Sequence, residues 1–245
     1  MSLSVIDCPS PNFNERGGIK PSLVILHYTD MLSAQDALDR MCDVEANVSA
    51  HYMIEENGRI HSLVDEDKRA YHAGVSFWNG EKDINAHSIG IELCNPGHSN
   101  GYRAFPVQQM QALVELLRDI HTRHDIPDYN ILAHSDVAPN RKIDPGELFD
   151  WKMLASRNLG LWPQPEAGDD KEATLFLMNE ARLRQAFVAY GYDGKHDLAT
   201  LVSAFQRHFY PEIFRQSALV GIPDHETALR LAALVRQKNA TKLVN

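Results

Sequence analysis

Short apolar runs in the first two thirds of the chain predict buried β-strands. Residues 23–26 read Leu-Val-Ile-Leu and end at a histidine, and such branched runs are typical of strands buried on both faces. Residues 88–94 alternate isoleucine and leucine with glycine and glutamate, which predicts a strand with Glu92 opposite its apolar row. Residues 130–133 form a third short run, again followed by a histidine.

A hairpin is predicted between the first two of these strands. Residues 50–55 and 59–64 are two partly apolar segments separated by Glu-Asn-Gly. Asn-Gly between two such segments is the strongest short-range hairpin signal, because both residues accept the positive φ of a tight turn. The pair therefore adds two antiparallel strands to the predicted set.

Apolar residues spaced three and four positions apart predict the helices. The longest apolar stripe covers residues 107–120 and starts after a proline. Residues 33–42 begin with a serine and carry an aspartate three positions later, which predicts a capped N-terminus. Residues 150–159 begin with an aspartate cap and are followed by a glycine, which predicts a shorter helix.

The last third of the chain predicts a linker and a helical module. Residues 163–171 combine two prolines, a glycine and several charges, as linkers do. Helical patterns follow over residues 175–190, 198–209 and 224–238. The predicted division is a first domain over residues 1–160, a linker over 161–173 and a three-helix domain over 174–245. Strands alternate with helices only in the first domain, which predicts an α/β or α+β fold there.

Composition and charge narrow the class of protein. The chain has 44% hydrophobic and 23% charged residues, which is ordinary for a soluble globular protein. Its net charge is −9, from 24 basic and 33 acidic side chains. An acidic chain without a basic patch is a poor candidate for binding nucleic acid, because phosphates need clustered Lys and Arg. A glycopeptide substrate remains compatible with this charge.

The cysteines and the N-terminus give expectations about compartment. Three cysteines without a CxxC spacing form neither a disulfide framework nor a thiolate zinc site. No apolar run is long enough for a transmembrane helix. Residues 1–14 lack the basic and apolar regions of a secretory signal as written. These features favour a reducing compartment only weakly.

Two histidines and one aspartate are candidate metal ligands. His27 and His134 end apolar strand segments, and Asp144 lies in a turn-rich loop. Strand ends project into the crevice where sites of α/β sheets form. Catalytic zinc takes three protein ligands from His and carboxylate and leaves one position open. The pattern therefore predicts a zinc site, with satisfied structural histidines as the alternative.

Glu92 and Lys142 are candidates for the catalytic groups. A carboxylate in an otherwise apolar strand is costly unless it is paired or has a task, so Glu92 is a candidate general base. Lys142 precedes Asp144 by two positions and points the same way in an extended loop, where it can stabilise an oxyanion. The alternatives are a solvated glutamate and an ordinary surface lysine.

Six ordered segments resemble the N-acetylmuramoyl-L-alanine amidase type 2 family, related to peptidoglycan recognition proteins and phage amidases. The segments read VILHYT, VSAHYMI, YHAG, NAHSIGIE, AHSD and RKIDPGELFDW, and they span roughly residues 20–155. No single motif is decisive, but six in the family's order are specific. The resemblance implies a central mixed β-sheet with helices packed on it.

The resemblance also implies roles for individual residues. It implies that zinc is bound by His27, His134 and Asp144, and that Glu92 and Lys142 are the catalytic pair. It implies that the substrate groove includes His72, Ala73, Asn47 and Asn85. The expected activity is hydrolysis of the amide between N-acetylmuramic acid, or its anhydro form, and L-alanine in peptidoglycan or muropeptides, in cell-wall turnover or recycling.

The C-terminal helices resemble the peptidoglycan-binding domain of cell-wall hydrolases. The match rests on residues 183–187, 190–193 and 204–209, whereas the usual glycine-rich second half is shortened. The alternative is a structural cap on the amidase domain. A wall-binding module favours the periplasm or cell envelope, and the absence of a signal peptide makes the cytoplasm the second choice. A monomer is favoured.

Two other classes of function remain open at this stage. A non-catalytic peptidoglycan recognition protein has the same fold, but such relatives typically lack part of the ligand set. A cysteine hydrolase would use Cys94, which lies two residues beyond Glu92, although a buried structural thiol is the favoured interpretation of that residue. No GxSxG motif occurs, which speaks against a serine hydrolase.

Overall fold

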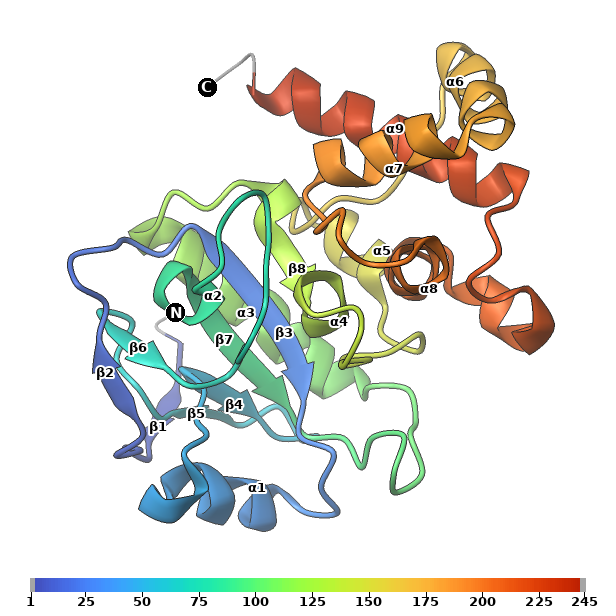
Figure 1. Ribbon diagram of the computed structural model, residues 1–245. Helices are drawn as coiled ribbons and strands as arrows, with labels where there is room; N and C mark the ends of the chain where they lie inside the picture. Colours follow the sequence, from blue (N-terminus) through green and yellow to red (C-terminus); the bar gives the residue numbers. More distant parts are fainter. Residues whose placement is uncertain (1–2, 243–245) are drawn as a thin grey trace.

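A six-stranded mixed sheet forms the centre of the computed structural model, which describes residues 3–242 (Figure 1). Its strand order is β1-β5-β4-β7-β3-β8, and β2 and β6 form a separate antiparallel pair. The strands are β1 (Val5–Asp7), β2 (Phe13–Glu15), β3 (Leu23–Tyr28), β4 (Tyr52–Ile54), β5 (Ile60–Ser62), β6 (Lys68–Ala70), β7 (Ser88–Leu93) and β8 (Ile131–Ala133). Only the β4–β5 hairpin is antiparallel within the sheet, so the predicted mixed sheet and the predicted hairpin are confirmed.

Helices cover both faces of this sheet. They are α1 (Ala34–Cys42), α2 (Ile84–His87), α3 (Val107–Arg123), α4 (His134–Val137), α5 (Trp151–Ala155), α6 (Ala167–Met178), α7 (Glu180–Tyr190), α8 (Leu198–Phe209) and α9 (His225–Lys242). Short 3-10 turns occur at η1 (Val44–Ala46), η2 (Asp128–Asn130), η3 (Pro211–Arg215) and η4 (Ser217–Leu219). Within residues 3–242, no helix is both long and apolar enough to cross a membrane.

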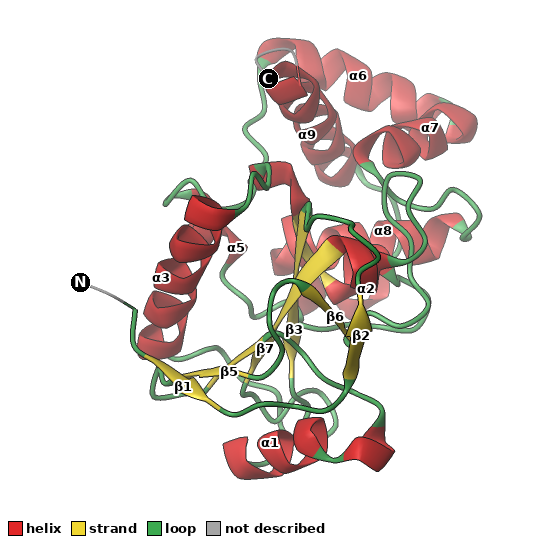
Figure 2. Cartoon of the chain, turned by 90° about the vertical axis from the view of Figure 1, so that its left-hand side faces the viewer, coloured by secondary structure: helices red, strands yellow, loops and turns green. Residues whose placement is uncertain are grey.

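The period-two alternation of the central strands decides which layer each side chain meets. Val24 and Leu26 of β3 pack with α3, whereas Leu23 and Ile25 pack with the C-terminal helices. In β7 the apolar row joins the α3 side. Figure 2 shows α3 on one side of the strands and α8 on the other. The alternate row of β7, which carries Glu92, therefore faces the side where β3 carries His27.

Helix caps account for the ends of the predicted helices. The Ser33 side chain accepts a hydrogen bond from the backbone N–H of Asp36, which confirms the predicted start of α1. The helix predicted over 150–159 starts as expected after Asp150 but ends at Ala155. Asn158 and Gly160 have positive φ values of 59° and 84°, and left-handed residues do not continue a helix.

The C-terminal third departs from the prediction in two places. The single helix expected over 175–190 is two helices, because Asn179 is extended and its side chain caps α7 by accepting from Arg182 N–H. Helix α6 begins at Ala167, inside the predicted linker, where Asp169 accepts from the backbone N–H of Glu166. The described part of this segment thus contains four α-helices instead of three.

The C-terminal helices share one hydrophobic core with the sheet. Leu23, Ile25 and Leu132 of the sheet belong to the same buried cluster as Phe187 and Phe205 of the helices. Trp78 lies in this cluster and contacts the rings of the C-terminal residues Tyr190 and Tyr192. These helices are therefore docked against the face of the sheet that carries His27.

Candidate active site and metal centre

Three predicted ligands meet at the carboxyl edge of the sheet. His27 lies near the end of β3, and His134 starts α4 directly after β8. Because β3 and β8 are neighbouring parallel strands, their carboxyl ends lie at one edge. The Nδ1 atoms of His27 and His134 are 2.9 Å apart, and each is 3.0 Å from Oδ2 of Asp144. All three residues are buried and form a group able to hold a metal ion.

Hydrogen bonds at the far side of each ring fix which nitrogen carries the proton. His134 Nε2 lies 3.1 Å from the carbonyl oxygen of Ala73, which can only accept, so Nε2 is protonated. His27 Nε2 lies 3.0 Å from Nδ1 of His72. The other nitrogen of His72 lies 3.2 Å from Ser88 Oγ, whose hydroxyl donates to Ile84 O. His72 therefore donates to Ser88 and accepts from His27.

This network leaves three unprotonated acceptor atoms facing one another. Both Nδ1 lone pairs and the Asp144 carboxylate converge within hydrogen-bond distance, an arrangement that is repulsive unless a cation lies between them. Ligands of a tetrahedral zinc ion are about 3.3 Å apart at bond lengths of about 2.0 Å, close to the spacings found. The donor set therefore fits a divalent metal ion.

The electrostatics of the ligands agree with this assignment. Burial and the neighbouring His134 lower the pKa of His27 to about 4, so its imidazole is neutral. Burial alone would raise the pKa of the Asp144 carboxyl, but His134 and His27 hold it well below its usual range. Neutral imidazole and ionised carboxylate are the protonation states that bind metals.

The loop after Tyr71 supports the two histidine ligands. The side-chain oxygen of Asn85 accepts from the backbone N–H groups of His72 and Ala73, at 3.1 and 2.7 Å. Arg141 donates to Val75 O at 2.8 Å and also contacts the Ala73 carbonyl. The structure thus brings three of the predicted groove residues to the metal group. His72 contacts the ring of His27, and the Ala73 carbonyl accepts from the ring of His134. Asn85 holds the loop that carries both.

Gly90 has no side chain, and the ring of His72 fills the space beside it. A Cβ atom added at Gly90 would lie 2.4 Å from the imidazole of His72. Gly90 is two residues before Glu92 on the same face of β7. The glycine in the alternating β7 pattern therefore has a specific reason, because any side chain there would displace the residue that orients His27.

Glu92 lies beside the metal group. It is the register partner of His27 on the neighbouring parallel strand, so both side chains emerge on one face. Its Oε2 atom is buried and has no hydrogen-bond partner within the described residues. Burial raises the pKa of Glu92 to about 8; Asp144 adds to this, whereas Lys142 opposes it. The half-buried Lys142 is thus close enough to act on Glu92 electrostatically.

Asn47 and Cys94 are not brought into the metal group. Asn47 is exposed at the end of η1, with φ of 50° and a side chain that donates to Glu45 O. Cys94 is buried after β7, and burial raises the pKa of its thiol to about 12. A thiol of this kind stays protonated and is a poor nucleophile. The geometry therefore gives the cysteine hydrolase alternative no support.

Several residues that support the site were given no role by the sequence analysis. Arg16 is buried and donates to the backbone carbonyls of Asn85, Ala86 and Ser88. Asn85 in turn holds the loop after Tyr71. The buried ring of His51 accepts from Gly90 N–H at 2.9 Å. Asp136 was quoted within a motif but given no role, and the structure buries it beside His134. Its position two residues after a ligand was the signal that could have identified it.

The buried His-His-Asp group and the half-buried Glu92 lie in the region of the chain that is similar to known proteins. The sequence profile of the N-acetylmuramoyl-L-alanine amidase family (Amidase_2) matches residues 17–147, more than half of the chain. The chain therefore belongs to this family of enzymes. The matched region contains the three candidate ligands, Glu92 and Lys142.

Relatives fall into a longer and a shorter kind. The N-acetylmuramoyl-L-alanine amidase AmiD of Escherichia coli K12 is 34% identical over 241 residues, 88% of this chain and 82% of the relative. The 1,6-anhydro-N-acetylmuramyl-L-alanine amidase AmpD of Haemophilus influenzae is 34% identical over 166 residues, 60% of this chain and 88% of the relative. The longer kind shares most of the chain, including much of the C-terminal third.

Solved structures agree on the fold. AmpDh3 of Pseudomonas aeruginosa superposes with a TM-score of 0.79 at 32% identity, covering 94% of this chain and 95% of that one. E. coli AmiD, solved with anhydro-N-acetylmuramic acid-L-Ala-D-γ-Glu-L-Lys, has a TM-score of 0.75 at 33% identity, covering 92% and 98%. The predicted family and fold class are thereby confirmed. Glycan binding by the C-terminal helices stays a prediction.

Proposed function

We propose that this chain is a zinc-dependent amidase that hydrolyses the bond between N-acetylmuramic acid, or its anhydro form, and the L-alanine of the stem peptide. The observation that carries this proposal is the convergence of His27 Nδ1, His134 Nδ1 and Asp144 Oδ2 beside Glu92, whose buried Oε2 has no hydrogen-bond partner among residues 3–242. The substrate class is supported by relatives whose names describe this bond. The reaction would serve cell-wall turnover or recycling.

Zinc is the proposed cofactor because of the donor set. Two imidazoles and one carboxylate are a ligand set of catalytic zinc sites, in which a fourth position stays open to water or substrate. When bound, zinc supplies Lewis-acid chemistry that polarises a carbonyl and lowers the pKa of water. His72 and the Ala73 carbonyl hold the rings so that both Nδ1 atoms face Asp144 Oδ2, and these three atoms would hold the ion.

Glu92 is the proposed general base and acid. Its carboxylate can accept a proton from water as the water attacks the lactyl carbonyl, and can return it to the leaving amine of L-alanine. A carboxyl pKa raised by burial brings these two transfers closer in energy at neutral pH. Lys142 is proposed to balance the negative charge that develops on the carbonyl oxygen.

The loop after Tyr71, which supports the two histidine ligands, is also the proposed wall of the substrate groove. A surface hollow of about 570 Å³ lies beside it and is lined by Gly74, Val75 and Asn85, among others. His72 and Ala73 are buried, so their proposed contribution is to shape this wall rather than to offer exposed contact area. Asn47 follows the 3-10 turn η1 and is not among the residues that line this hollow, so its proposed contact with substrate would use another surface of the protein.

Product analysis tests the proposal directly. Anhydro-N-acetylmuramic acid carrying a tripeptide should yield the free sugar and a peptide with L-alanine at its N-terminus, as seen by mass spectrometry. Chelator should abolish the reaction and added zinc should restore it. Cleavage between other residues, or full activity after metal removal, would refute the proposal. Intact sacculi assayed in parallel would show whether the enzyme acts on whole wall or on soluble fragments.

A further inference from the structure

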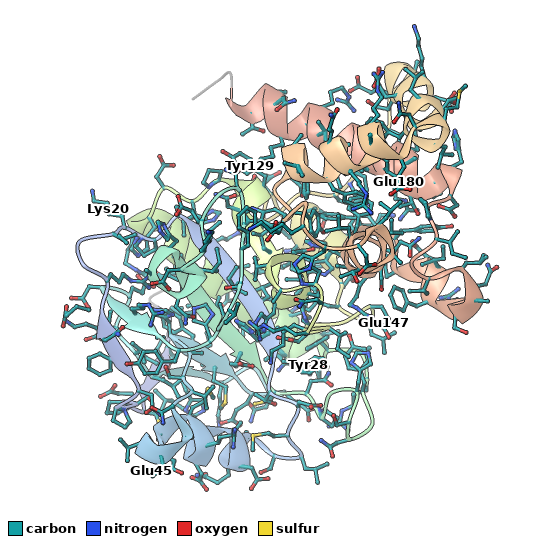
Figure 3. All side chains as sticks on the ribbon, viewed as in Figure 1. Lys20, Tyr28, Glu45, Tyr129, Glu147 and Glu180 are labelled. Carbon is teal, nitrogen blue, oxygen red and sulfur yellow. The ribbon has the colours of Figure 1, made fainter. Side chains whose placement is uncertain are left out.

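Two consecutive residues of α8 reach the two chain segments that carry His134 and Asp144. His208 Nδ1 lies 2.6 Å from Oδ2 of Asp136, two residues after His134. Arg207 forms an ion pair with Glu147, three residues after Asp144. Figure 1 shows α8 beside α4, and Figure 3 labels Glu147 on the loop that passes below α8.

Asp136 is the centre of this contact. Its Oδ2 atom accepts from His208 and from the backbone N–H of Ala133, at 2.6 and 2.8 Å. Its Oδ1 atom accepts from the hydroxyl of Tyr192 at 2.6 Å. Asp136, Tyr192 and His208 are each at most 2% exposed. Two of the three donors therefore come from the C-terminal helical part, 56 and 72 residues away in sequence.

Backbone hydrogen bonds carry this restraint from Asp136 to the ligands. Its bond to Ala133 N–H fixes the first turn of α4, and His134 is the first residue of that helix. The N–H of Ser135, the next residue, donates to the carbonyl oxygen of Asp144 at 3.1 Å. Fixing α4 thus fixes His134 directly and Asp144 through one bond.

The ring of His208 is itself held in place. It stacks on Trp151 of α5 at a centroid distance of 3.7 Å and an interplanar angle of 27°. Apolar residues of similar volume would fill this space without the cost of burying a carboxylate. A buried carboxylate that meets directed donors gives one defined geometry instead. The arrangement therefore favours a positioning task over simple stabilisation.

We propose that Tyr192 and His208 are positioning residues of the metal centre, which act through Asp136 to hold His134 and Asp144 in metal-binding geometry. This inference rests on the proposed metal-dependent function. It gives the C-terminal helices a part in the amidase site itself, whether or not they bind glycan. The shorter relative AmpD of Haemophilus influenzae matches 60% of this chain, whereas the longer relative AmiD matches 88%.

The test compares zinc affinity across matched variants of the full chain. His208→Leu and Tyr192→Phe each remove one donor to Asp136, and each should weaken zinc binding about tenfold, as loss of outer-shell partners does. His208→Asn can place an amide N–H where Nδ1 was and should restore most of the affinity. Affinity is measured by competition with a chelator, and the absorption of a bound cobalt(II) ion reports ligand geometry.

Phe176→Leu is the control for a merely structural effect. Phe176 is buried in α6, in the same hydrophobic cluster, and α6 packs against α7 and α9 rather than against Asp136. It should lower the unfolding free energy and leave zinc affinity within about twofold, a difference below 0.5 kcal/mol. Equal zinc loss in this variant, or unchanged affinity in both His208→Leu and Tyr192→Phe, would overturn the inference. If the unmodified chain binds no zinc, the proposed function itself fails.

Discussion

His72 Nδ1 lies 3.0 Å from His27 Nε2, and this contact determines which nitrogen of His27 is available to a metal. Since His72 donates through its other nitrogen to Ser88, its Nδ1 must accept. His27 is then protonated at Nε2 and bare at Nδ1, the atom that faces Asp144. The buried ring of His72 thus determines which nitrogen of His27 is protonated.

Replacement of His72 should weaken metal binding without removing a ligand. His72→Ala leaves the His27 ring free to rotate and exchange tautomers, and zinc affinity should fall about 10- to 100-fold. His72→Asn is the matched control, because its side-chain oxygen can accept where Nδ1 did. Chelator competition measures both. Equal affinities in the original chain and His72→Ala would show that this contact has no orienting role.

Gly90→Ala should disturb the same contact from the strand side. The added Cβ would lie 2.4 Å from the His72 ring, inside van der Waals contact. Overpacking of this kind typically costs about 1–3 kcal/mol of stability. Urea unfolding should show that loss, and zinc affinity should fall as well, because His72 must move away from His27.

Gly168→Ala is the control for this substitution. Gly168 lies in α6, and a Cβ atom added there meets nothing within 4 Å. Alanine is favoured over glycine in a helix by up to about 1 kcal/mol, so stability should hold or rise. If Gly90→Ala behaved like this control in both measurements, the close packing of His72 on β7 would be disproved.

Glu92→Gln should separate metal binding from turnover. Glutamine keeps the size of the side chain but cannot take a proton from water, so kcat should fall by about 10²- to 10⁴-fold. Zinc content should remain that of the original chain, because Glu92 is outside the ligand group. Metal analysis beside a muropeptide assay checks both. Retained turnover would exclude Glu92 as the base.

Glu66 should make stability depend on acid pH. Burial would raise the pKa of this carboxyl, but hydrogen bonds from Arg123, His124 and Tyr52 outweigh it and lower the pKa to about 2. Between pH 4.5 and 2 the unfolded chain binds this proton more readily than the folded one, so stability is lost as pH falls through that range.

Glu66→Gln tests this contribution. At pH 7 the variant should be less stable by about 1.5–3 kcal/mol, the usual value for hydrogen bonds to a charged group, and the difference should shrink below pH 4.5. Glu115→Gln, on the exposed face of α3, is the control and should change little. Urea unfolding at several pH values measures it. A difference between the original chain and Glu66→Gln that stays constant down to pH 2.5 would contradict the assignment.

Much of the site could be predicted because each ligand interrupts a simple pattern. His27 and His134 end apolar runs, and neighbouring parallel strands bring such ends together. Glu92 was recognisable as a polar residue in an alternating strand, and register with His27 explains its place. Asp144 and Lys142 were candidates because they lie two positions apart in a turn-rich loop, and the resemblance to a family implied the same roles.

The remaining features depend on contacts that have no spacing rule. Asp136 and His208 are 72 residues apart, and nothing in either segment predicts their contact. The start of α6 inside a proline- and glycine-bearing segment depends on the reciprocal cap between Glu166 and Asp169. A local cap and a shared core with the sheet outweighed composition that is typical of a linker.

The central claim is that His27, His134 and Asp144 bind one divalent ion. Calorimetric titration of chelator-treated protein with zinc tests it most directly. We predict saturable binding of a single ion, and a loss of affinity of at least about 100-fold in His134→Ala, since a ligand is removed. Two results would contradict the account: no saturable binding by the original chain, or folded His27→Ala and His134→Ala variants that bind zinc as tightly as the original chain does.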